Sequence, residues 1–241
     1  MNPLLFLADR YADGSSRNLI PIPPGMMIVA GGTGSGKTRA AARLVAELAY
    51  TPQARAWIVS YKYEDLFAPL LEVPNARVYM GADSLRGLED FYNNTFKARM
   101  EGAKDFSPAW IFLDELALMT MTLSRKESDE VKRMITSILV AGRALCCWAV
   151  IGVQRASSEL FTGSLGAKDN FSTRILFGNA TKIGADVLEF DKSAFLPAKA
   201  PGEGHILLNG IEQIPCRVAA NLGDKYILAK VMEDVKRVVT R

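Results

Sequence analysis

A strand that runs directly into a glycine-rich loop constrains the fold of this chain more than any other feature. Met26–Ala30 is an uninterrupted apolar run, the loop that follows reads G-G-T-G-S-G-K-T, and an alanine-rich helical pattern then continues to Tyr50. Glycines allow backbone conformations that other residues rarely adopt, so successive N–H groups can surround a phosphate at the positive end of a helix. The arrangement predicts a nucleoside triphosphate site, and a chance turn is the weaker interpretation.

The spacing of the loop assigns a role to each of its parts. Glycine, four further residues and Gly-Lys-Thr form a specific pattern, whereas a glycine-rich turn alone would be weak. Lys37 is expected to neutralise the β and γ phosphates, and the Thr38 hydroxyl to coordinate Mg²⁺. The residues predicted to bind ATP are Gly31, Gly32, Thr33, Gly34, Ser35, Gly36, Lys37 and Thr38.

Two further strand patterns end in polar residues. Trp110–Leu113 is followed by Asp114 and Glu115, and Trp148–Val153 is followed by Gln154. The carboxyl ends of parallel strands face the ligand crevice, so we expect Asp114 to hold Mg²⁺ through water and Glu115 to polarise the attacking water. Gln154 can donate to a γ-phosphate oxygen and accept from water. Without the phosphate loop, the acidic pair would indicate a helix cap or turn, and Gln154 a loop contact.

The alternation of short apolar runs with helical patterns predicts an α/β fold with a mostly parallel central sheet flanked by helices. A chain of 241 residues is expected to form one domain over residues 1–241. The expected strands are Met26–Ala30, Ala56–Ser60, Arg77–Met80, Trp110–Leu113, Trp148–Val153, Arg174–Gly178 and His205–Leu208. The expected helices are Thr38–Tyr50, Leu85–Met100, Lys126–Ala144 and, within 224–241, Asp224–Val239. The apolar stripe of the last helix favours packing on the core over binding a partner.

Composition excludes several classes of function. His205 is the only histidine, so neither a histidine-based metal site nor a Ser/His/Asp triad is expected. The 3 cysteines give no disulfide framework and no metal-ligand spacing. The net charge of +3 permits an anionic partner without demonstrating one. No signal peptide or transmembrane segment is recognisable, which predicts a cytoplasmic location.

The motifs, in their order and spacing, resemble the motor domain of FtsK/SpoIIIE-type DNA translocases, within the wider FtsK/HerA group of P-loop ATPases. The resemblance covers most of the chain and rests on M-M-I-V-A-G-G-T-G-S-G-K-T, I-F-L-D-E, A-G-R-A-L-C-C-W-A-V-I-G-V-Q-R and N-F-S-T-R-I-L-F-G-N-A-T-K-I-G-A-D-V-L. G-E-G-H-I-L-L-N-G resembles the closing hairpin of those motors, and D-G-S-S-R-N-L-I-P-I-P, within residues 1–25, the strand pair before their phosphate loop. The segment Ser60–Leu66 keeps only part of the family's pattern.

The resemblance implies a RecA-like sheet assembled as a homo-oligomeric ring, usually a hexamer, with ATP between subunits and double-stranded DNA in the pore. It makes Arg143 a candidate arginine finger that reaches the neighbouring subunit's γ phosphate; its position alone would indicate a surface arginine at a helix end. Arg174 matches another arginine of the family. Its two alternative roles are a contact with the nucleotide and a structural ion pair. Lys168, in Phe161–Asn170, would touch DNA phosphates if this segment faces the pore, and otherwise lies in a solvated loop.

The leading hypothesis is a compact ring motor that moves double-stranded DNA for a mobile element, in conjugative transfer or phage packaging, with a possible protein adaptor for DNA specificity. The membrane region and the sequence-reading domain of the large chromosome motors have no counterpart in this sequence, so chromosome segregation is not expected. The alternative is an ATP-dependent switch or assembly factor that acts on a protein partner without translocation. A small-molecule kinase is the weakest hypothesis, because no acceptor site or lid signature is visible.

Overall fold

The centre of the molecule is a ten-stranded sheet with the strand order β2-β1-β10-β9-β8-β3-β7-β6-β4-β5. This computed structural model describes residues 5–13, 15, 19–40, 44, 54–154, 167–179 and 182–218. The strands are β1 (Leu5–Asp9), β2 (Leu19–Ile22), β3 (Met26–Gly31), β4 (Arg55–Ser60), β5 (Ala76–Met80), β6 (Ala109–Asp114), β7 (Cys147–Val153), β8 (Phe171–Phe177), β9 (Glu203–Leu208) and β10 (Glu212–Arg217). The helices are α2 (Ser84–Phe91), α3 (Ala98–Met100), α4 (Leu116–Thr122), α5 (Arg125–Ala141) and α6 (Lys182–Val187).

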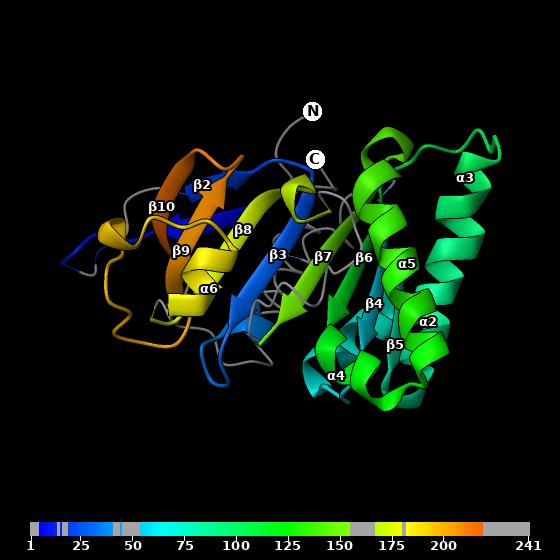
Figure 1. The fold of residues 1–241 in the computed structure, drawn as a ribbon, viewed down its shortest axis with the longest axis horizontal. Coiled ribbons are helices and arrows are strands. Elements are labelled where there is room, and N and C mark those ends of the chain that lie inside the picture. Colours follow the sequence, from blue (N-terminus) through cyan, green and yellow to red (C-terminus); the bar gives the residue numbers. More distant parts are fainter. Residues whose placement is uncertain are drawn as a thin grey trace.

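The sheet has a parallel part and an antiparallel part. Strands β8, β3, β7, β6, β4 and β5 run parallel to one another, whereas β9, β10, β1 and β2 add antiparallel pairs beyond β8. Figure 1 shows the antiparallel strands at one end of the molecule and α2, α3 and α5 beside the parallel strands at the other. The predicted α/β fold with a mostly parallel, helix-flanked sheet is confirmed.

The central strands are apolar throughout because both of their faces are covered. Every residue of β3, β6 and β7 is buried, as expected for parallel strands packed between other layers. Helix α5 begins at a capping box in which Ser124 and Glu127 satisfy each other's backbone N–H groups. Its buried stripe is Val131, Met134, Ile135, Ile138 and Leu139. These are the positions whose helical spacing was visible in the sequence.

All of the expected strands are present, and the differences concern the helices and the ends of the elements. The predicted helix Leu85–Met100 is α2 and α3 joined by a π-helical stretch at Tyr92–Lys97. The predicted helix Lys126–Ala144 is α-helical only to Ala141 and then continues as the 3-10 helix η4 (Gly142–Leu145). The predicted strand Arg174–Gly178 is β8, which begins earlier, at Phe171, and ends at Phe177, since Gly178 has a φ of 84°.

Some helices were not predicted from the sequence, and one predicted helix lies outside the described residues. Helices α4 and α6 and the 3-10 helix η1 (Asp65–Glu72) were not predicted. The helix after the phosphate loop is described at residues 37–40 and 44 only. The predicted helix Asp224–Val239 lies outside the described residues, and the single domain over 1–241 stays a prediction.

Candidate nucleotide-binding site

The phosphate loop connects the end of β3 to a helix that begins at Lys37. The Ser35 N–H donates to the Gly32 carbonyl at 3.1 Å, and the Ala40 N–H donates to the Gly36 carbonyl at 2.9 Å. Gly36 has a φ of 91°, and a Cβ there would lie 2.5 Å from the Gly202 nitrogen. Glycine is therefore required at this position by backbone conformation and by space.

Lys37 and the acidic pair lie together at the carboxyl end of the parallel strands. The Lys37 ammonium is buried and donates to Asp114 Oδ1 at 2.7 Å, and it lies 3.6 Å from Glu115 Oε1. A buried lysine needs such partners, because the desolvation of an unpaired charge is costly. The structure thus brings together two strand-loop motifs that are 77 residues apart in the chain.

Glu115 has a left-handed backbone conformation, with a φ of 56°, between β6 and α4. Such a conformation is uncommon for a residue with a side chain and is concentrated at functional sites. Gln154 Nε2 donates to both carboxylate oxygens of Glu115 at 2.9 Å. Burial acts to raise the pKa of Glu115, but the Gln154 hydrogen bond and the charges of Lys37 and Lys62 outweigh it and hold the pKa below its ordinary value. Glu115 is therefore a carboxylate at neutral pH.

The surroundings of Asp114 fit a divalent cation. Its Oδ2 atom is buried and has no hydrogen-bond partner among the residues that the structure describes, although such atoms are normally satisfied. Thr38, in the first turn of the helix after the loop, offers a hydroxyl at the same end of the sheet. Carboxylate and hydroxyl oxygens are the ligands that Mg²⁺ prefers.

Gly152 leaves the space that the Asp114 carboxylate fills. A Cβ on this β7 residue would lie 2.6 Å from Asp114 Oδ1. Only glycine therefore allows the two strands to place the carboxylate at this depth. This role of Gly152 has no sequence signature, since a glycine inside a buried strand carries no signal of what lies beside it.

A cavity of about 1420 Å³ covers these residues, which is ample room for a nucleoside triphosphate. One wall is the phosphate loop from Gly32 to Arg39, and Glu115, Gln154 and Pro201 also line the cavity. The segment after β4 also lines the cavity, through Lys62, Tyr63, Glu64, Asp65, Leu66, Ala68 and Glu72.

Lys62 and Glu64 are site residues that the sequence reasoning missed. Lys62 Nζ lies 3.6 Å from Glu115 Oε1. Burial, together with the nearby charge of Asp114, raises the pKa of Glu64. The only signal for them was the partial family pattern in Ser60–Leu66.

Arg143 and Arg174 lie away from this cavity. Arg143 is exposed in η4, before the amino end of β7, and lines a second cavity of about 520 Å³ together with Arg174. Arg174 is buried, pairs with Glu189 and donates to the Leu188 carbonyl at 3.3 Å. It therefore forms an ion pair, one of its two expected roles. The side chain of Lys168 lies outside the described residues.

Comparison with curated proteins gives a relative in Bacillus subtilis (strain 168), although no family model matches the chain. This relative, the FtsK domain-containing protein YdcQ, is 26% identical over 194 residues, which are 74% of this chain and 40% of YdcQ. The chain thus spans less than half the length of this relative.

Solved structures of ATPases share the fold. EccC of Thermomonospora curvata (ATPases 2 and 3), in complex with a signal sequence peptide, has a TM-score of 0.68 at 16% identity over 98% of this chain and 48% of its own. The pCW3 conjugation coupling protein TcpA with ATPγS has a TM-score of 0.67 at 19% identity over 95% of this chain and 69% of its own. The genome packaging NTPase B204 of Sulfolobus turreted icosahedral virus 2, with the same analogue, has a TM-score of 0.51 at 11% identity over 81% and 98%.

Sequence and fold lead to the same group of proteins. Within the described part of the chain, no helix is both long and apolar enough to cross a membrane. The phosphate loop, the acidic end of β6 and the glutamine after β7 occupy one edge of a sheet shared with ATPases of known structure. The chain is a homologue of an FtsK domain-containing protein and has the fold of the FtsK/HerA-type P-loop ATPases.

Proposed function

We propose that the chain is an ATP-driven DNA translocase of the FtsK/HerA type, which forms a ring and hydrolyses ATP at subunit interfaces to move double-stranded DNA. The observation that carries the proposal is that Lys37, Glu115 and Gln154 line one cavity, with Lys37 hydrogen-bonded to Asp114. This arrangement provides a phosphate-binding ammonium and an oriented carboxylate within one site. Such a pair suits hydrolysis of a phosphoanhydride bond.

The residues divide the chemistry among them. Lys37 binds the phosphates, and Glu115, held by Gln154, accepts a hydrogen bond from the attacking water and orients it. Mg²⁺, when bound by Thr38 and Asp114, supplies neutralisation of the phosphate charge. The Lys37 side chain is buried, which limits its contact with water and thereby strengthens the electrostatic effect of its ammonium.

The DNA part of the proposal draws on the relatives. TcpA is a conjugation coupling protein and B204 packages a viral genome, and both functions fit a motor that serves a mobile element. We propose a cytoplasmic hexamer in which Arg143 reaches the neighbouring subunit's site and a protein adaptor supplies DNA specificity. Lys168 would contact DNA phosphates if Phe161–Asn170 faces the pore, and otherwise lies in a solvated loop. Phosphate contacts of this kind do not depend on sequence.

A DNA-stimulated ATPase assay tests this function. ATP turnover is expected to rise with double-stranded DNA, and the stimulation is expected to weaken as the salt concentration rises, since phosphate contacts release counterions. Turnover that ignores DNA at every salt concentration would refute the DNA motor. Lys37→Ala should abolish ATP binding, and Glu115→Gln should retain binding while it lowers kcat by about 10²–10⁴-fold.

The arginine finger has its own test. Mixed rings of Arg143→Ala and Lys37→Ala chains should recover part of the activity, because an intact Lys37 site can then face an intact Arg143. A finger of this type contributes about 10³–10⁵-fold in kcat, so recovery is measurable above the single variants. No recovery at any mixing ratio would leave Arg143 with a structural role only.

The second candidate is an ATP-dependent switch or assembly factor that acts on a protein partner. The fold shared with EccC, which was solved with a signal sequence peptide, favours this candidate. Displacement of a triplex-forming strand from linear DNA separates the two functions. A motor removes the strand in an ATP-dependent reaction, whereas a switch leaves it in place.

A further inference from the structure

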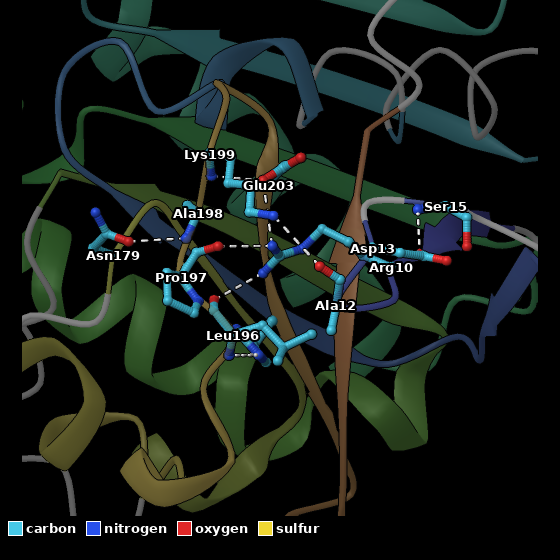
Figure 2. Close-up of polar contacts among 11 residues, drawn as sticks. Arg10, Ala12, Asp13, Ser15, Asn179, Leu196, Pro197, Ala198, Lys199 and Glu203 are labelled. Atoms are coloured by element: carbon cyan, nitrogen blue, oxygen red, sulfur yellow. Dashed lines mark hydrogen bonds and ion pairs between the residues drawn. The ribbon is translucent and has the colours of Figure 1, made fainter.

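A buried arginine organises the loop that precedes β9. Arg10 follows β1 and is only 4% exposed. Its guanidinium donates to the carbonyls of Leu196 and Pro197, both at 2.8 Å, and pairs with Glu203 at 3.3 Å (Figure 2). Burial of a guanidinium is costly unless it is hydrogen-bonded; both terminal nitrogens of Arg10 have partners, whereas its Nε has none among the described residues. The loop backbone is therefore folded around this charge.

The same loop is fixed at neighbouring positions, and we call residues Leu196–Gly202 the Pro201 loop. Glu203 Oε2 also accepts from the Lys199 N–H at 2.7 Å. The Ala198 N–H donates to Asn179 Oδ1 at 2.9 Å, as Figure 2 shows. Successive residues are thus held by groups from β1, from β9 and from the end of β8, so the loop has a defined conformation.

The Pro201 loop ends on the phosphate loop. The Gly202 N–H donates to the Ser35 carbonyl at 2.7 Å, and the Gly202 carbonyl accepts from the Val218 N–H at 2.8 Å. Gly202 also occupies the space next to Gly36, where a Cβ would lie 2.5 Å from its nitrogen. Pro201 itself is exposed and lines the cavity that holds the phosphate loop and Glu115. The Pro201 loop therefore reaches the nucleotide cavity through Pro201.

Strand order decides which part of a nucleotide the Pro201 loop faces. Asp114, Glu115 and Gln154 follow β6 and β7, which lie on one side of β3, whereas Asn179 follows β8 on the other side. The Gly178 N–H donates to the Glu203 carbonyl at 2.8 Å and so ties the end of β8 to the first residue of β9, directly after the Pro201 loop. A triphosphate that extends from Glu115 along the phosphate loop past β3 brings its nucleoside to the β8 side, where Pro201 lines the cavity.

We infer that the Pro201 loop forms the nucleoside side of the nucleotide site, with the Pro201 ring against the sugar or base, and that Arg10 is the positioning residue for this loop. The inference rests on the proposed function, since it assumes that a nucleoside triphosphate occupies the cavity. Arg10 does not touch the nucleotide. It acts through the carbonyls of Leu196 and Pro197 and through Glu203.

Binding of ATP and of inorganic tripolyphosphate, each with Mg²⁺ and measured by calorimetry, tests the inference. Tripolyphosphate has the phosphate chain but no nucleoside. Pro201→Ala removes apolar contact area and should weaken ATP binding about tenfold, with tripolyphosphate affinity unchanged. Arg10→Gln should have the same effect, and Arg10→Lys, which keeps a charge beside Glu203, a smaller one. Pro74→Ala, in an exposed turn outside the cavity, is the matched control and should change neither affinity.

The outcomes separate the possible failures. A parallel loss of ATP and tripolyphosphate affinity would mean that the Pro201 loop only supports the phosphate loop, and would overturn the inference. Unchanged ATP affinity in Pro201→Ala and Arg10→Lys would overturn it as well, even if Arg10→Gln does not fold. A native chain that binds neither ligand would overturn the proposed function, and this inference with it.

Discussion

Replacement of Gly152 by alanine tests whether the Asp114 carboxylate, at the end of β6, must keep its observed position. A Cβ at this position would lie 2.6 Å from Asp114 Oδ1, whereas ordinary van der Waals contacts begin at 3.4 Å. The carboxylate must therefore retreat by about 0.8 Å, the difference between these distances. The same oxygen accepts the 2.7 Å hydrogen bond from Lys37, so the displacement disturbs that bond too.

The magnitude follows from this displacement. A misplacement of about 1 Å in a catalytic arrangement can lower the rate by ~10²-fold, so we expect Gly152→Ala to reduce kcat for ATP hydrolysis by about that factor. The extra methyl group in a packed interior should also lower the free energy of unfolding by about 1–3 kcal/mol. ATP affinity should change less than kcat, because the phosphate loop keeps its backbone N–H groups and the Lys37 ammonium is still present to bind the phosphates.

Steady-state ATPase kinetics, ATP titration and urea unfolding of the same preparation provide the measurement. Ile151→Val is the matched control, since it lies on the same strand and should lose about 0.5–1.5 kcal/mol of stability with kcat retained. If Gly152→Ala hydrolysed ATP at the native rate, Asp114 would not need its observed position. The assignment of its carboxylate to the site would then be wrong.

Three further predictions concern charged groups. Asp90 accepts hydrogen bonds from Trp57 and Arg77, so Asp90→Asn should lower the free energy of unfolding by about 1.5–3 kcal/mol in urea titrations; an unchanged midpoint would contradict this. Burial and, to a smaller extent, the Arg10 charge lower the pKa of His205 from 6.5 to about 4. Between these two values the unfolded chain binds a proton that the folded chain does not. The free energy of unfolding therefore has its full value above pH 6.5 and falls by about 3 kcal/mol as the pH approaches 4. His205→Gln should therefore lose less stability than the native chain over this range, and equal losses would refute the assignment. Lys62→Met should move the acid limb of the kcat profile to higher pH, because the Lys62 charge helps to hold the Glu115 pKa down, and Lys62→Arg should leave the limb in place.

Contiguous patterns made the core of the site predictable. The strand, loop and helix around Lys37 occupy adjacent residues, so the sequence alone specifies their order and their chemistry. The acidic pair and Gln154 follow apolar strands, and parallel strands bring their carboxyl ends to one edge of the sheet. The structure places these groups within hydrogen-bonding distance of one another.

The contacts that were missed depend on tertiary register. Arg10 and Glu203 are 193 residues apart in the chain, and no local pattern links them. Helix α4 was also missed, because L-A-L-M-T-M-T continues the apolar character of β6. Only the left-handed turn at Glu115 separates the two elements, and a backbone reversal at a glutamate has no sequence signature comparable to that of glycine.

The position of Arg143 limits how it can take part in catalysis. It precedes β7, whereas Gln154 follows that strand, and the seven residues between the two ends span roughly 20 Å at about 3.3 Å per residue. An arginine side chain cannot bridge this distance, so Arg143 cannot reach the γ phosphate bound by its own chain. A finger role therefore requires a second copy of the chain, whose Arg143 lies beside the γ phosphate bound by the first copy. If a monomeric preparation showed full ATPase activity that Arg143→Ala abolished, this argument from strand length would fail, and Arg143 would have to act through the fold.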